Sequence, residues 1–140
     1  PYRYLAHLSK NGSGKPESLL THSDLVLKYA VRLIEDNKLD DNLNRIIDAI
    51  GSDSLQIKNH IKLFYLKAIY WHDIGKINEN FQKDKMKNSF ENIENGISSK
   101  HSILSAYMYL YSCFDCILKQ YQDKNERTQL ISICLYFSLS

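Results

Sequence analysis

Residues 55–77 read LQIKNHIKLFYLKAIYWHDIGKI, and this stretch decides the fold. Its apolar residues occupy almost every side of a helix, which predicts a central, well-buried helix beginning after the serines at 52 and 54. Gly75 suits the end of such a helix and lets the chain turn sharply there. His72 and Asp73 would then lie side by side in its last turn.

The rest of the chain has the same helical character. Apolar spacing predicts further helices over 19–34, 43–50, 101–121 and from 128 onward, with a short helix or turn at 77–84. Pro16 and Glu17 fit the first turn of a helix, and Asn37 with the acidic pair at 40–41 marks a break. Only 5 Gly and 2 Pro occur, and no strand-like alternation stands out. The sequence predicts one all-α domain over residues 1–140, a bundle of about five to six helices.

Bulk properties place the chain among ordinary globular proteins. Hydrophobic residues make up 44%, charged residues 24%, and the net charge of +2 is too small to imply nucleic-acid binding without a local basic patch. No signal peptide or membrane-length apolar run is visible. The odd number of cysteines, 3, predicts reduced thiols in a cytoplasmic protein. Cys113 and Cys116 form a C-x-x-C, but its apolar helical context favours core cysteines over a zinc site.

Two more histidines and a lysine join the His-Asp pair as candidates. His22 lies on a mostly apolar helix face, where a hydrogen-bonded core histidine is the structural alternative to a ligand. His101 starts a helix, where an exposed first-turn histidine is the alternative. Imidazole and carboxylate together suit borderline divalent ions, and an Asp can offer one oxygen to each of two ions. Lys76 could then meet a phosphate as a point charge.

Three sequence runs carry a resemblance to a known family. They are PESLLTHSDLV (16–26), HDIGKINENFQ (72–82) and KHSILSAY (100–107). In this order they closely resemble the HD nuclease domain of CRISPR-associated type I interference systems, which stands alone or is fused to a superfamily 2 helicase. The likeness covers about residues 4–110.

The resemblance implies a helical HD fold and a metal-dependent nuclease that degrades single-stranded DNA, with a helicase and a guide-RNA surveillance complex as partners. By matching motif, His22, His72 and Asp73 look like ligands of one ion. Asp73 would bridge to a second ion that His101 helps to hold, and Lys76 would place the scissile phosphate. The resemblance admits up to two divalent ions, which could be manganese, iron, nickel, cobalt or magnesium.

The chain departs from the family at its end. Family members carry an adjacent His pair and a later Asp, whereas this chain stops at Ser140 within an apolar pattern. We therefore expect a C-terminally truncated HD domain with weak metal affinity. Two other functions stay open: an HD phosphohydrolase acting on nucleotides, and a catalytically inactive docking module. KDKMK (83–87) is either a solvated loop or a DNA contact.

Overall fold

The computed structural model describes residues 4–9, 15–36, 38–49, 54–89 and 100–139. Within these ranges the main helices, in chain order, are α1 (Leu19–Glu35), α2 (Lys38–Ala49), α3 (Leu55–Trp71), α4 (Glu79–Asp84), α5 (His101–Gln120) and α6 (Lys124–Leu139). A 3-10 helix, η1 (Ile74–Ile77), separates α3 from α4, and two short strands, β1 (Leu5–His7) and β2 (Glu17–Ser18), precede α1. The predicted all-α bundle is confirmed.

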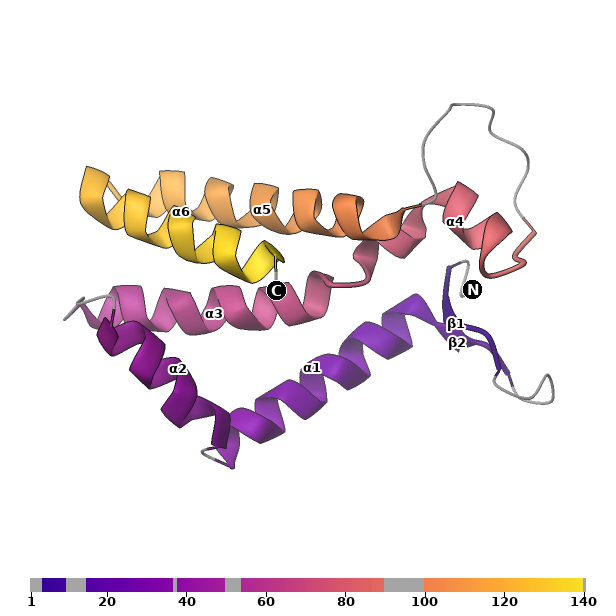
Figure 1. Cartoon of the computed structure of the whole chain (residues 1–140), viewed down its shortest axis with the longest axis horizontal. Coiled ribbons are helices and arrows are strands. Elements are labelled where there is room, and N and C mark those ends of the chain that lie inside the picture. Colours follow the sequence, from indigo (N-terminus) through magenta and orange to yellow (C-terminus); the bar gives the residue numbers. More distant parts are fainter. Residues whose placement is uncertain (1–3, 10–14, 37, 50–53, 90–99, 140) are drawn as a thin grey trace.

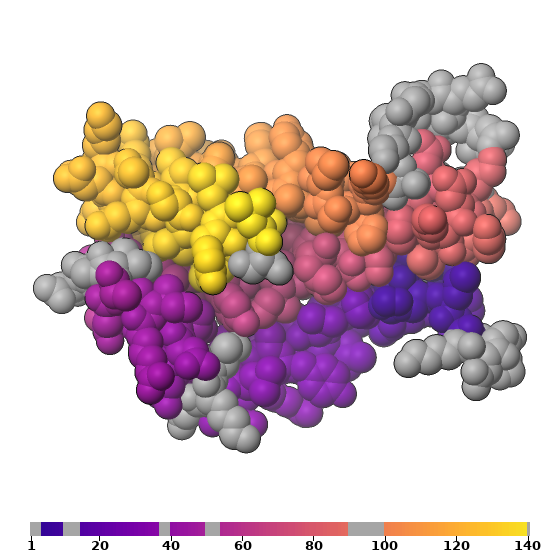
Figure 2. All heavy atoms as spheres, in the orientation of Figure 1, coloured from indigo at the N-terminus to yellow at the C-terminus, as the bar shows by residue number. Residues whose placement is uncertain are grey.

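The helices are arranged around α3. In Figure 1, α1 and α2 lie along one side of α3, and α5 and α6 lie along the other. The strands, η1 and α4 gather at one end of the bundle, and Figure 2 shows this end packed against the first turns of α1 and α5. None of the helices in the described ranges combines the length and apolar character that a membrane span requires.

The predicted central helix begins where expected but ends earlier, so that His72 follows its last residue and Asp73 lies outside it. Ser54 caps α3, its hydroxyl accepting from the Ile57 N–H, and the helix ends at Trp71. Its residues Ile61 and Phe64 are fully buried against α5 and α6. Each such side chain contributes roughly 1.5–3 kcal/mol through burial. The rest of this core is formed by Ile47, Ile57, Tyr109, Cys113, Ile117, Tyr121, Leu130, Ile133, Cys134 and Phe137.

The cysteines agree with their sequence-based interpretation. Cys113 and Cys134 are fully buried in the core between α5 and α6, and Cys116 is half-buried beside it. All three thiols are free. Because Cys113 points into the core while Cys116 lies at its edge, the C-x-x-C does not form an exposed thiol pair.

Two predictions about element boundaries are wrong. Glu17 does not open a helix: it pairs as part of β2 with His7 of β1, and the Ser18 hydroxyl caps α1 instead by accepting from the Thr21 N–H. The acidic pair at 40–41 does not break the chain but lies in the first turn of α2. Carboxylates there favour the helix because they face the positive end of its dipole.

Gly75 is required for a different reason from the one expected. It lies within η1 rather than ending α3, since α3 stops at Trp71 and Asp73 precedes η1. A Cβ at Gly75 would stand 1.9 Å from the main-chain oxygen of His101 and 2.8 Å from Ser105 Oγ. The absent side chain therefore lets η1 contact the first turn of α5 directly. This contact brings the His-Asp motif against His101.

Candidate metal centre

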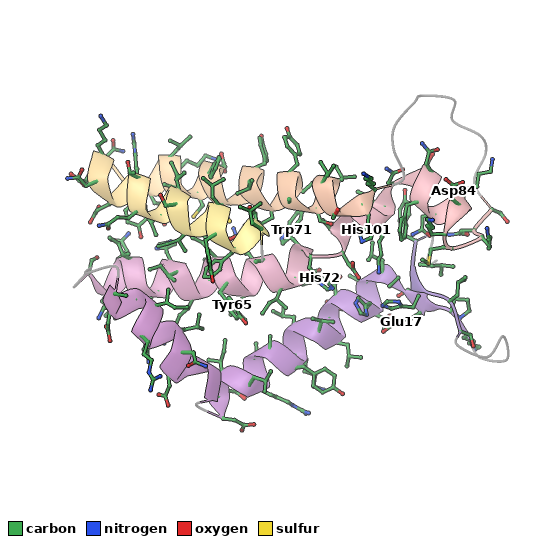
Figure 3. All side chains as sticks on the ribbon, viewed as in Figure 1. Glu17, Tyr65, Trp71, His72, Asp84 and His101 are labelled. Carbon is green, nitrogen blue, oxygen red and sulfur yellow. The ribbon has the colours of Figure 1, made fainter. Side chains whose placement is uncertain are left out.

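The carboxylate of Asp73 is the centre of the site. It is buried, and a histidine from each of three helical segments approaches it: His22 on α1, His72 at the end of α3 and His101 at the start of α5. The Nε2 atoms of His22 and His72 lie 3.3 Å and 3.4 Å from Asp73 Oδ2. His101 Nε2 lies 3.6 Å from the other oxygen, Oδ1. Figure 3 shows His72 and His101, with Glu17, converging at this end of the bundle.

Lys76 is the closest cation to Asp73. Its Nζ donates to Asp73 Oδ2 at 2.7 Å and to the main-chain oxygen of Ala6 at 3.1 Å. The side chain is only 7% exposed, so both partners are met inside the protein. A buried ammonium in this position holds the Asp73 carboxylate in place. The geometry therefore favours Lys76 as a support for Asp73 over the sequence-based expectation that it meets a phosphate.

The ionisation of Asp73 follows from these neighbours. Burial alone would raise the pKa of its carboxyl group. The contact with His72, the hydrogen bond from Lys76 and the positive charge of Lys76 outweigh burial and hold the pKa well below its ordinary value. The same contact with Asp73 raises the pKa of His72. Asp73 is thus an anion throughout the physiological range and attracts further positive charge.

Both ring nitrogens of His22 face carboxylates. Nδ1 lies 3.3 Å from Glu17 Oε2, and Nε2 lies 3.3 Å from Asp73 Oδ2. A neutral imidazole has one N–H and one lone pair, so one of the two contacts would set a lone pair against a carboxylate. A second ring proton removes this repulsion, and so does a cation held between Nε2 and Asp73. The contact with Glu17 is the carboxylate–imidazole pairing that commonly orients metal-binding histidines.

The other two predicted histidines are also oriented by their surroundings. His72 Nδ1 lies 2.6 Å from the main-chain oxygen of Ile69, which can only accept, so the proton is on Nδ1 and Nε2 faces Asp73. The His101 ring packs edge-on against Phe81, with 4.6 Å between centroids. Burial lowers the pKa of His101, and the charge of Lys76 adds to this effect, which favours the neutral ring that metals bind.

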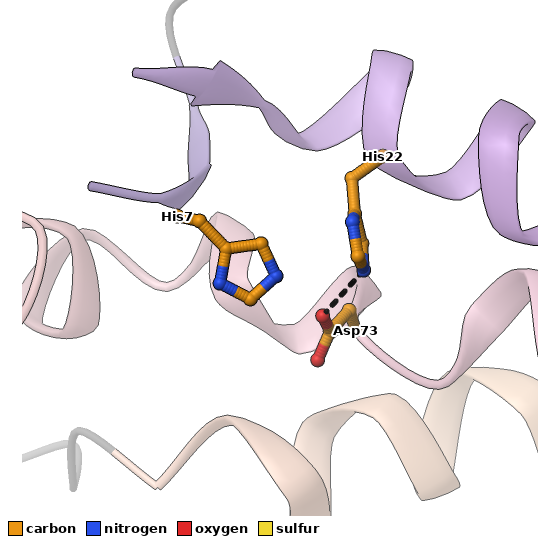
Figure 4. A group of neighbouring side chains, drawn as sticks. All are labelled: His7, His22 and Asp73. Carbon is orange, nitrogen blue, oxygen red and sulfur yellow. Dashed lines mark ion pairs between the residues drawn. The ribbon is translucent and has the colours of Figure 1, made fainter. Parts of the chain in front are cut away.

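His7 belongs to the site although the sequence did not single it out. Its ring meets that of His22 at 4.7 Å between centroids, nearly perpendicular to it. Within the described residues, His7, His22 and Asp73 form the one group whose metal-ligand atoms all lie within 4.8 Å of one another, and Figure 4 shows the two rings turned toward the carboxylate. His7 reaches Asp73 and His22 because β1 pairs with β2 beside the start of α1, and the sequence pattern gives no sign of this pairing.

The donor set fits a divalent cation. Two ligand atoms bound to one ion at about 2.1 Å lie roughly 3.0–3.4 Å apart at angles of about 90–109°. The separation of 3.3 Å between His22 Nε2 and Asp73 Oδ2 falls in this range, and His7 completes the group whose ligand atoms lie within 4.8 Å of one another. His72 and His101 approach Asp73 at 3.4 Å and 3.6 Å but stand outside that group. The carboxylates of Asp73 and Glu17 also outnumber the single ammonium of Lys76. The residues present can therefore hold a metal ion.

The structure thus brings together every residue that the sequence analysis proposed for the site. His22, His72, Asp73, Lys76 and His101 all lie around one carboxylate, although their sequence separations reach 79 positions. His60 lies elsewhere, on α3, and contacts Tyr121. Comparisons with family models, curated proteins and solved structures gave no match for this chain, so its function has to be inferred from the site and from the sequence resemblance.

Proposed function

We propose that this chain is a metal-dependent hydrolase of phosphodiester bonds, of the HD nuclease type, acting on single-stranded DNA. One observation carries the proposal: three imidazole Nε2 atoms from three separate helical segments surround the two oxygens of one buried carboxylate. A core histidine needs one or two ordinary hydrogen bonds, and three histidines around one anion exceed that need. Imidazole and carboxylate donors together are typical of borderline divalent ions.

The two sides of Asp73 support a bridging role. Oδ2 faces His22 and His72, whereas Oδ1 faces His101, so the carboxylate presents a separate oxygen to each group of histidines. Divalent ions bound there would polarise a phosphodiester and lower the pKa of a bound water. In the protein itself, Lys76 fixes Asp73, Glu17 orients the His22 ring, and the Ile69 carbonyl oxygen orients His72.

The choice of DNA as substrate rests on the sequence resemblance and on a nearby basic segment. Lys83, Lys85 and Lys87 are exposed on α4 and directly after it, close to the motif. Phosphate groups of a strand approaching the site would meet this charge. On the same resemblance, we propose a superfamily 2 helicase and a guide-RNA surveillance complex as the partners that deliver the strand.

A second candidate function is hydrolysis of a free nucleotide. A pocket of about 330 Å³ adjoins the site, and its walls include Trp71, His72 and Ser105. That volume lies at the small end of the range for small-molecule sites. A single nucleotide would occupy such a pocket, with its phosphate toward His72.

Cleavage of circular single-stranded DNA by the protein tests the proposal. Manganese, nickel and magnesium are supplied separately, and Asp73→Asn is compared with wild type. Asn keeps an oxygen to accept from Lys76 but loses the negative charge, so the variant tests the metal more cleanly than Ala. Asp115→Asn, at an exposed aspartate on α5, is the matched control.

Cleavage that depends on added metal, persists in Asp115→Asn and is abolished in Asp73→Asn is the expected result. Hydrolysis of free nucleotides without DNA cleavage would favour the second candidate. A folded protein that binds no divalent ion and cleaves neither substrate would contradict both and leave the docking module as the better explanation.

A further inference from the structure

The strand that carries His7 has little to hold it on its own. β1 has three residues and pairs with the two residues of β2, with an irregular register between Leu5 and His7. Isolated two-stranded ribbons of this size are marginal in water. His7 itself is exposed, so core packing does not fix its ring. Its place beside His22 and Asp73 requires another support.

Gln82 supplies this support from α4. Its side chain is fully buried, with 0% exposure, and its amide acts as the partner that a further strand would provide. Oε1 accepts from the Leu5 N–H at 2.8 Å, and Nε2 donates to the Leu5 carbonyl oxygen at 2.7 Å. Both main-chain groups of one strand residue are therefore satisfied by one side chain, 77 positions away in sequence.

The same amide ties the strand to the His-Asp motif. Nε2 of Gln82 also donates to the Lys76 carbonyl oxygen at 2.7 Å, within η1. Lys76 Nζ in turn donates to the carbonyl oxygen of Ala6, the residue before His7. Ala6 is thus bonded directly to Lys76, and Leu5 is linked to Lys76 through Gln82. The position of His7 relative to Asp73 depends on this network.

We propose that His7 is an additional metal ligand carried by β1 and that Gln82 is the positioning residue that sets its contribution to metal affinity. The proposal rests on the metal centre of the proposed function. An imidazole from His7 would add to that of His22 at Asp73, since the ligand atoms of these three residues lie within 4.8 Å of one another. It would also make metal binding depend on α4, whose Phe81 packs against the His101 ring.

The experiment is a double-mutant cycle on the binding of Co²⁺, with affinity from titration calorimetry and coordination from the visible absorption of the ion. His7→Phe keeps a ring against His22 but removes the ligand nitrogens. Gln82→Met keeps the length of the side chain but removes the amide. Gln120→Leu, at an exposed position on α5, is the matched control. If Gln82→Met does not fold, Gln82→Glu replaces it, since it retains the acceptor for the Leu5 N–H.

We expect His7→Phe and the Gln82 variant each to weaken Co²⁺ binding by about 10–100-fold and to change the visible spectrum in the same way. In the double variant, the loss should equal that of His7→Phe within about twofold, since Gln82 acts through His7. Gln120→Leu should leave the affinity unchanged. The inference is overturned if wild type binds Co²⁺ and His7→Phe binds it equally well, or if the two losses multiply. No Co²⁺ binding by wild type would overturn the metal centre itself.

Discussion

Replacing Gly75 by alanine should separate η1 from α5. The added Cβ would stand 1.9 Å from the His101 main-chain oxygen and 2.8 Å from both the His101 carbonyl carbon and Ser105 Oγ. The Gly75 N–H also donates to Ser105 Oγ at 2.8 Å, a buried hydrogen bond between the two segments. Any movement that relieves the contact with His101 therefore pulls this bond apart.

The size of the effect follows from these contacts. Side-chain Cβ atoms essentially never approach another heavy atom within 3.0 Å, so the segments must separate by about 1 Å. Overpacking of this kind costs roughly 1–3 kcal/mol. Leaving the buried Gly75 N–H without an acceptor adds about 1–3 kcal/mol. We expect Gly75→Ala to lower the free energy of unfolding by about 2–6 kcal/mol in total.

Urea denaturation followed by circular dichroism, with EDTA present, measures this loss. Ser105→Ala is the control, because it removes the same hydrogen bond without steric conflict and should cost about 1–2 kcal/mol. In the Ser105→Ala background, Gly75→Ala should still cost about 2 kcal/mol or more, since its closest conflict is with the main chain of His101. A cost below about 1 kcal/mol in wild type, or full relief by Ser105→Ala, would refute the close-approach explanation.

Three further predictions follow from the buried groups. Lys76→Met should lower the free energy of unfolding by about 3 kcal/mol, because it leaves the Asp73 carboxylate buried without its ammonium partner. In a protein that already carries Asp73→Asn, the same substitution should cost less. An equal cost in both backgrounds would contradict the pairing. The pKa of Asp73 is lowered in the folded state, so its stabilisation is complete above the unfolded pKa of about 3.9 and is lost as pH falls toward the folded value. The difference in stability between wild type and Asp73→Asn in EDTA should therefore change only as pH falls below about 5, and should shrink further toward pH 3; a constant difference down to pH 3 would count against this ionisation. Cys116 should react with a thiol reagent before the buried Cys113 and Cys134, and equal rates would show that the core opens more readily than its packing indicates.

Local patterns in the sequence were sufficient for the helices. The apolar spacing of 55–71 predicted α3 and its start after Ser54, because helix formation depends on residues three and four positions apart, although the helix ends at Trp71 and not at Gly75. The same patterns predicted the burial of Cys113, whereas Cys116, predicted alongside it, is only half-buried. The adjacent His72 and Asp73, with His22 and His101, could be selected from sequence because these residue types in order carry a recognisable chemistry.

Only the tertiary structure decided how these residues are supported. The two-residue strand at Glu17 has no local signal, since it forms through pairing with β1. Gly75 is required by the carbonyl of His101, and Gln82 is buried because it replaces a strand partner for Leu5. The contacts of Gln82 with Leu5 and of Lys76 with Ala6 join residues 77 and 70 positions apart. Such contacts depend on how whole elements pack, so the periodicity of any single segment cannot reveal them.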